Sequence, residues 1–145
     1  MLSFKVTYAI QILDLLHRNK EGILISDIHS SFPYLPSRTI VSDTVRLMEK
    51  GGVIRKISER NRRLRIAVPL SDLTLYDLSQ VMDGGIGLGK SVGFNRWYFG
   101  YLETHPHIAE TEQRLEDSIA SEMRTITVAG LIDDTMNIRP TPIQP

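Results

Sequence analysis

Hydrophobic residues near the N-terminus recur at the three- and four-residue spacing of one helical face. The stripe consists of Tyr8, Ile12, Leu15 and Leu16, and it is widened by Ala9 and Leu13. This periodicity predicts an amphipathic helix of about four turns.

Two further helices are predicted, separated by a short segment with two prolines. Ser26 and Asp27 can cap a short helix that runs through Phe32, and the prolines of the following PYLP prevent its continuation. Ser37 can cap a longer helix through Lys50, which the next two glycines end. Two helices joined by a tight turn are a candidate helix-turn-helix.

A basic β-hairpin is predicted after these helices. VIRKI, which begins at Val53, and RRLRIAV, which ends at Val68, are β-rich runs on either side of the polar turn SERN. In the second run the aliphatic side chains share one face, so Arg63 and Arg65 point the other way. Three helices and a basic hairpin form a winged helix, which reads DNA with one helix and holds the duplex with the hairpin. The alternative is a solvated hairpin whose arginines only maintain solubility.

Charge is distributed unevenly along the chain, although its formal net charge is zero. Residues 1–82 carry twelve Lys and Arg against eight Asp and Glu, whereas residues 83–145 carry five against nine. The basic excess is greatest at residues 55–65, where Glu59 is the only acidic side chain. This asymmetry indicates a basic face for a polyanion.

Composition excludes several classes of site. The 145 residues contain no cysteine, which excludes disulfides, thiolate zinc sites, cysteine-held iron–sulfur clusters and cysteine nucleophiles. No acid–base pair or nucleophile constellation indicates an enzyme. Because the chain has no apolar run of about 18 residues and no signal-peptide pattern, we expect a cytoplasmic protein.

A glycine-rich segment, GGIGLGKS from Gly84 to Ser91, matches the phosphate-binding loop pattern, with Lys90 as its lysine. Such a loop follows a buried strand, but the preceding LYDLSQVMD has apolar residues at helical spacing. The sequence therefore favours a glycine linker, and nucleotide binding is the less favoured alternative.

An aromatic segment and two histidines follow the linker. A possible effector pocket, with Arg96 fixing an anion, would be lined by Arg96, Trp97, Tyr98 and Tyr101. The alternative is ordinary core packing of these rings. His105 and His107 lack further ligands nearby, so no metal site is predicted, and Pro106 suits the first turn of a helix.

The next segment predicts a charged helix with one narrow apolar stripe. The stripe consists of Ile108, Leu115, Ile119, Met123 and Ile126. A narrow stripe on a polar helix suits pairing with a second copy, which makes these residues a candidate dimer interface. The alternative is a surface helix that folds back on its own domain. Three prolines make the tail from residue 136 irregular.

Several stretches resemble the winged-helix transcriptional regulators of the Rrf-two type, the family of IscR, NsrR and CymR. They are Leu2-Ser3, Lys5, Tyr8-Ala9, MEKGGVI (48–54), the hairpin, PLSDLTLYDLSQVMDG (69–84) and TITVAGLID (125–133). The resemblance covers the chain to about residue 135. It implies a homodimeric transcriptional regulator that binds a palindromic DNA site.

The chain departs from this family at positions that bear on its cofactor and on its DNA sequence preference. Cluster-binding relatives place three cysteines before the dimerisation helix, whereas residues 84–107 contain none. The chain is therefore similar to the cluster-free branch, without a cofactor. The hairpin tip lacks the usual glycines, and Ile40 and Val41 align with the family's Tyr-Leu pair, so the family's sequence preference does not transfer.

Together these patterns predict a mainly α fold with a small β-hairpin (α+β). The expected divisions are a winged-helix domain at 1–83, a linker at 84–105, a dimerisation helix region at 106–135 and a tail at 136–145. The expected DNA-binding residues are Lys5, Arg38, Thr39, Ser42, Arg46, Arg60, Arg62, Arg63 and Arg65. The main alternative is a winged-helix module that binds another protein and no DNA.

Overall fold

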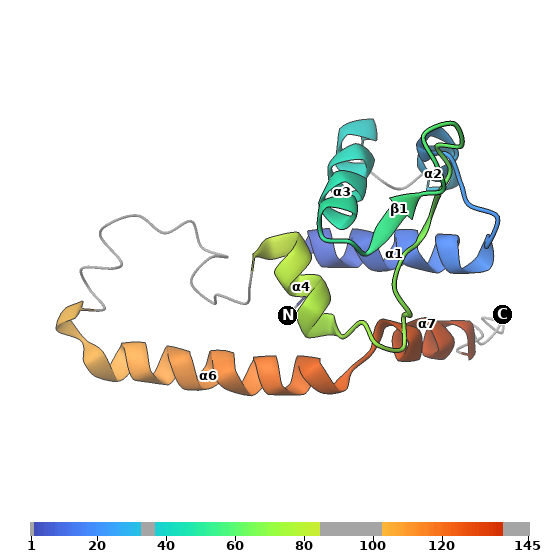
Figure 1. Ribbon diagram of the computed structural model, residues 1–145. Helices are drawn as coiled ribbons and strands as arrows, with labels where there is room; N and C mark the ends of the chain where they lie inside the picture. Colours follow the sequence, from blue (N-terminus) through green and yellow to red (C-terminus); the bar gives the residue numbers. More distant parts are fainter. Residues whose placement is uncertain (1, 33–36, 85–102, 138–145) are drawn as a thin grey trace, which may run out of the picture.

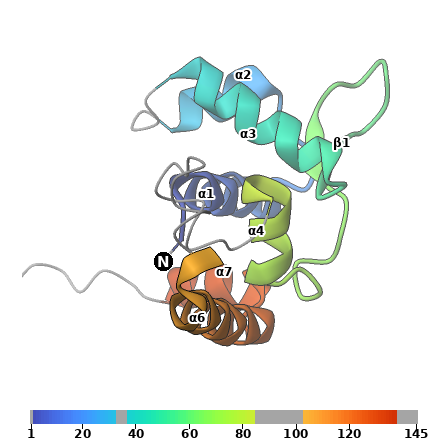
Figure 2. The same ribbon diagram turned by 90° about the vertical axis from the view of Figure 1, so that its left-hand side faces the viewer.

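The computed structural model describes residues 2–32, 37–84 and 103–137, without the side chains of residues 134–137. Its elements are α1 (Phe4–Arg18), α2 (Ile25–Ser31), α3 (Arg38–Lys50), β1 (Ile54–Lys56), β2 (Leu64–Ile66), α4 (Leu75–Asp83), α6 (Pro106–Thr125) and α7 (Val128–Asn137). Figures 1 and 2 show three layers: α2 and α3 on one side, α1 and α4 in the middle, and α6 and α7 on the other side. The fold is mainly helical with a two-stranded hairpin, which confirms the predicted class.

Helix α1 forms as its apolar spacing predicts. The hydroxyl of Ser3 accepts a hydrogen bond from the backbone N–H of Val6 (3.1 Å) and so caps the first turn. The helix buries one face, made of Val6, Ala9, Ile12, Leu13 and Leu16. This face is the centre of the core, which α3 and α4 cover.

The predicted cap of α2 is wrong. The helix begins at Ile25, its N-cap is Leu24, and no side chain caps it. Ser26 lies inside the first turn, where its carbonyl accepts the hydroxyl of Ser30 (3.0 Å). The β-bridge of Ile23 sets the start of the helix, because Ile23 and Leu24 are held extended and the helix begins directly after them.

Helix α3 has the predicted ends. Ser37 accepts the backbone N–H of Ile40 (3.3 Å), and the C-cap is Gly51. A Cβ on Gly51 would lie 2.6 Å from Cγ1 of Val81, so this glycine allows α4 to approach. Gly52 has a φ of 75°, a left-handed conformation that favours glycine and turns the chain into the hairpin.

The hairpin strands are shorter than the predicted runs, at three residues each, and they pair antiparallel. The polar turn is closed by a hydrogen bond from the N–H of Ser58 to the carbonyl of Asn61 (3.0 Å). Ile23 and Leu64 exchange two backbone hydrogen bonds, at 3.0 and 2.8 Å. This bridge joins the hairpin to the connection between α1 and α2.

Helices α6 and α7 meet the domain through backbone pairing as well as side chains. The N–H of Leu75 donates to the carbonyl of Ile126 (2.9 Å), and that of Val128 donates to Leu73 (2.8 Å). Val128 and Ile132 of α7 belong to the same buried cluster as the α1 face. The winged-helix residues therefore share their core with α7, and the region 106–135 contains two helices with a break at residues 126 and 127.

The element before the glycine-rich segment is a helix, as predicted. Helix α4 starts with a capping box between Thr74 and Asp77, and it ends at Gly84 with a φ of 72°. Residues 85–91 lie outside the described residues. Of the helices that the structure describes, none has the length and apolar character needed to cross a bilayer.

Candidate nucleic-acid interface

Helix α3 separates a buried face from a polar exposed one. Its buried face consists of Val41, Thr44, Val45 and Met48, and the hydroxyl of Thr44 donates to the carbonyl of Ile40 (2.7 Å). The four contact residues predicted on this helix, Arg38, Thr39, Ser42 and Arg46, are all exposed. The side of α3 away from α1 can therefore present hydrogen-bonding groups to a ligand.

The predicted arginines of the hairpin divide into two groups. Arg60 and Arg62 lie exposed in the loop, and neither forms an ion pair with any described residue. Arg63 is exposed at the base of the loop, where its Nη1 donates to the carbonyl of Gly22 (3.5 Å). Arg65 is half-buried in β2. Arg60 and Arg62 are thus available to a ligand, and Arg63 also reaches the connection between α1 and α2 through one long hydrogen bond.

Arg55, which belongs to the basic excess at residues 55–65, is a further cation on this hairpin outside the predicted DNA-binding residues. The strand register places it directly opposite Arg65, on the face away from the buried Ile54 and Leu64. Like charges directly opposite one another destabilise a hairpin, and no described carboxylate pairs with either arginine. An anion between them would offset this repulsion. The two-residue alternation of VIRKI contained the signal that could have identified Arg55.

An ion pair connects the hairpin to α3. Nζ of Lys56 lies 3.7 Å from Oε2 of Glu49, and both side chains are partly buried. Figure 2 shows the hairpin loop extending beside the α2 and α3 layer, on the side away from α6 and α7. Because β1 also packs against α3, the exposed face of α3 and the hairpin adjoin as parts of one surface.

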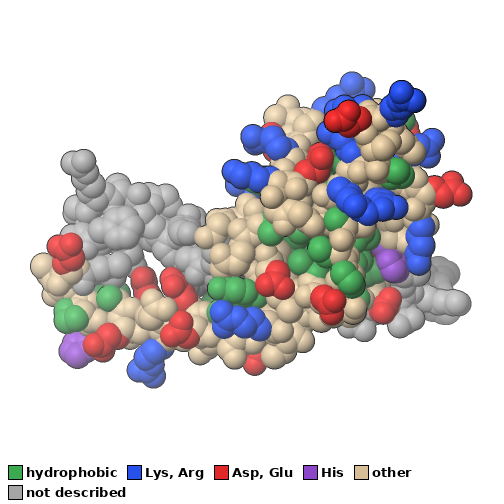
Figure 3. Space-filling view, in the orientation of Figure 1, with side chains coloured by type: hydrophobic (Ala, Val, Ile, Leu, Met, Phe, Trp, Pro, Cys, Tyr) green, Lys and Arg blue, Asp and Glu red, His purple; other side chains and the backbone are tan. Residues whose placement is uncertain are grey.

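Charge on the visible surface is segregated in the same way. Figure 3 shows many of the visible Lys and Arg side chains over α3 and the hairpin, and many of the acidic side chains along α6. Lys5 is exposed in the first turn of α1. The start of α1 is connected to the end of α4 because the hydroxyl of Ser3 donates to Oδ2 of Asp83 (2.6 Å).

The predicted apolar stripe of α6 divides between two environments. Met123 is buried in the core of its own chain, and Ile119 and Ile126 pack against that core. Leu115 and Ile108 remain exposed, at 51% and 37%. The folded-back alternative therefore describes the C-terminal half of α6, while the N-terminal half projects away from the core (Figure 1).

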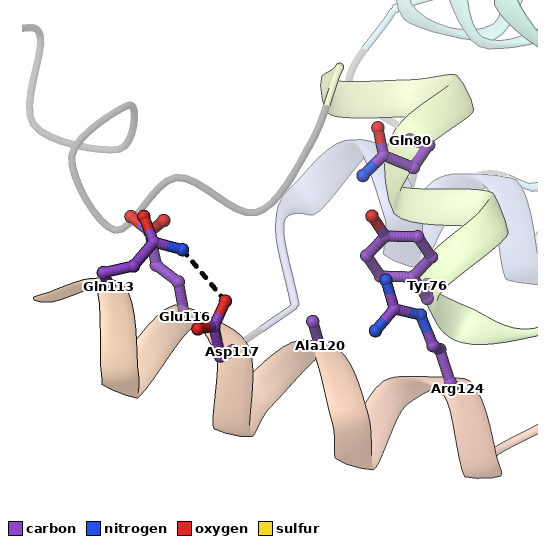
Figure 4. Close-up of a pocket in the computed structure, with 7 residues that line it drawn as sticks. All are labelled: Tyr76, Gln80, Gln113, Glu116, Asp117, Ala120 and Arg124. Carbon is purple, nitrogen blue, oxygen red and sulfur yellow. Dashed lines mark hydrogen bonds between the residues drawn. The ribbon is translucent and has the colours of Figure 1, made fainter.

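A groove of about 300 Å³ lies between α4 and α6 (Figure 4). It is lined by Tyr76 and Gln80 of α4 and by Gln113, Glu116, Asp117, Ala120 and Arg124 of α6. At one end the guanidinium of Arg124 lies 4.0 Å from the centre of the Tyr76 ring, a cation–π contact. At the other end Nε2 of Gln113 donates to Asp117 (2.9 Å). The sequence did not indicate this groove, because it depends on how the two helices lie together.

The predicted effector pocket, with Arg96, Trp97, Tyr98 and Tyr101, lies outside the described residues. His107 of the histidine pair lies 3.9 Å from Oε2 of Glu110 on the same helix. In the described parts of the chain, no three His, Asp or Glu side chains are grouped so that they could hold a metal ion.

Solved regulator structures share this arrangement of helices and hairpin. CymR of Staphylococcus aureus in its oxidized form superposes with a TM-score of 0.63 at 16% identity, over 91% of this chain and 95% of that chain. CymR of B. subtilis, a global cysteine regulator, gives 0.64 at 17% identity over 92% and 96%. IscR of T. potens gives 0.62 at 16% identity over 100% and 93%.

The chain has the fold of the Rrf-two-type regulators. This confirms the fold that the hairpin and residues 69–84 implied. No family model and no curated protein matches the sequence. At this identity the likeness to the Rrf-two-type structures establishes the fold, and the function rests on the residues of this chain.

Proposed function

We propose that the chain is a non-enzymatic, sequence-specific DNA-binding transcriptional regulator that acts as a homodimer on a palindromic operator. The observation that carries the proposal is the single surface formed by the exposed face of α3 and the arginine hairpin. Charge segregation supports it, because a polyanion is attracted to the basic side of the molecule. The fold shared with regulator structures supports it independently.

Each part of this surface has its own role in the proposal. Arg38, Thr39, Ser42 and Arg46 enter the major groove and meet base edges and phosphates. Arg60 and Arg62 reach the backbone or a narrow minor groove, where arginine is attracted by the negative potential. Arg63, Arg65 and Arg55 hold the flanking duplex from the base of the hairpin, and Lys5 adds a phosphate contact from α1.

The regulator acts without an iron–sulfur cluster in this proposal. The 145 residues contain no cysteine thiolate to hold one. We place the proposed regulator in the cytoplasm, where it would have access to the chromosome.

Recognition-helix variants test the proposal through sequence discrimination. Thr39→Ala and Arg46→Ala should each weaken binding to a duplex selected by the wild-type protein from a random library by about 1–3 kcal/mol. Binding to random duplex should change little, because the hairpin supplies most of that affinity. Fluorescence anisotropy measures both constants.

Thr125→Ala, at an exposed position on α6, is the matched control and should bind both duplexes as the wild type does. Selection that enriches no sequence, or an Arg46→Ala variant with wild-type discrimination, would contradict a reading role for α3.

The dimer is tested at the projecting half of α6. Leu115→Asp should convert a dimer at micromolar concentration into a monomer, because an unpaired carboxylate in an apolar interface costs several kcal/mol. Leu115 is the suitable position because it is 51% exposed in the single chain, so the fold tolerates the change. Sedimentation velocity gives the mass of each species.

Ser121→Asp adds the same charge on the opposite side of α6 and should leave the dimer intact. A Leu115→Asp protein that sediments as the wild-type dimer would place the interface elsewhere.

A further inference from the structure

An acidic residue lies within the face of α3 that is proposed to meet DNA. Asp43 follows Thr39 by four residues and precedes Arg46 by three, so these side chains share one side of the helix. Oδ1 of Asp43 lies 3.5 Å from Nη2 of Arg46, and the two side chains are 58% and 75% exposed. Among the described residues, none donates a hydrogen bond to the carboxylate of Asp43.

The carboxylate contributes little to the fold and opposes non-specific binding. An exposed ion pair between residues i and i+3 adds little stability. A negative charge on a surface that meets phosphates lowers affinity for every duplex. A carboxylate that lowers affinity for DNA in general can still be useful, because a charge that repels the wrong sequences contributes to specificity for the right one.

The chemistry of the major groove limits what the carboxylate can accept. Its hydrogen-bond donors there are the amino groups of cytosine N4 and adenine N6. Adenine also presents the N7 acceptor beside its amino group, which would repel the second carboxylate oxygen. Cytosine has no acceptor on that edge, so it is the base that suits an aspartate.

We propose that Asp43 is a specificity-determining residue that accepts a hydrogen bond from the N4 amino group of one cytosine in each half-site. This inference rests on the proposed DNA-binding function and deepens it. The neighbouring Arg46 remains close enough to read or to bind the adjacent position. Asp43 thus weakens binding to random DNA while strengthening binding to the operator.

The test is Asp43→Asn in the full chain, with two probes: the duplex selected by the wild-type protein and a random-sequence duplex. The variant should bind random duplex several-fold more tightly and the selected duplex roughly 5- to 150-fold more weakly. When each base pair of the selected duplex is replaced in turn, the wild type should lose affinity at one C·G pair per half-site. The variant should lose the preference for C·G at that pair and favour A·T instead, because the amide of asparagine pairs with N6 and N7 of adenine.

Glu59→Gln, which removes a carboxylate from the hairpin turn, is the matched control and should tighten binding to both probes in parallel. If Asp43→Asn also tightens both, or changes neither, the residue is a solvated charge and the inference is overturned. Weaker binding to both probes, with an intact circular dichroism spectrum, would also overturn the inference, because Asp43 would then act by positioning Arg46 through their ion pair. A wild-type protein that binds no duplex would overturn the proposed function itself.

Discussion

Replacing Ile132 by Ala should lower the free energy of unfolding by about 2–5 kcal/mol, the range typical for truncating a buried isoleucine. Ile132 is 1% exposed and lies in α7, in the same cluster as Val6 and Ile12 of α1. The side chain is far from the winged helix in sequence but forms part of its core. A cavity there destabilises the DNA-binding unit directly.

Ile25→Ala is the control, because Ile25 is 40% exposed at the start of α2, away from the proposed dimer interface on α6. It should cost less than about 1 kcal/mol, because a partly exposed side chain removes less apolar area from water on folding. Denaturant titrations at one fixed protein concentration compare the variants, since dimerisation contributes to apparent stability. Equal, small losses at the two positions would contradict the claim that α7 completes the core.

Local signals predicted both ends of α3 and the helical state of α4 correctly. Ser37 and Gly51 bound α3 as expected, and the helical spacing of LYDLSQVMD predicted α4. These features depend on a few neighbouring residues, which the sequence displays directly. The start of α2 was wrong because the bridge between Ile23 and Leu64 determines it, and these residues are remote in sequence. Capping propensity at Ser26 was weaker than that tertiary constraint.

The division of the α6 stripe could not be predicted from periodicity. Met123 and Leu115 have the same apolar character, and one stripe suits packing against the chain's own domain or against a second copy. Helix α6 packs on α4, and this packing places Met123 in the core of its own chain. The packing is accompanied by the backbone hydrogen bonds that join Ile126 to Leu75 and Val128 to Leu73. For the candidate site, the sequence indicated the exposed arginines but not that Arg63 is held by Gly22.

The second large effect is expected at the hairpin tip. Arg60→Ala combined with Arg62→Ala should weaken binding to every duplex, specific or random, and reduce its salt dependence. Each phosphate contact releases condensed counterions and contributes about 0.9 to the slope of log K against log salt concentration, so the four contacts of a bound dimer contribute about 3.6. Both arginines are exposed, and neither forms an ion pair with a described residue, so the double variant should fold normally.

The most direct test of the account is therefore a salt titration of the wild-type protein and this double variant on random-sequence duplex. Arg18→Ala with Arg114→Ala removes the same charge away from the proposed interface and should preserve the wild-type slope. We predict that the wild-type dimer binds with a steep negative slope and that the Arg60 and Arg62 variant has a slope smaller in magnitude by about 3.6. Absence of binding at low salt, or an unchanged slope and affinity in that variant, would contradict it.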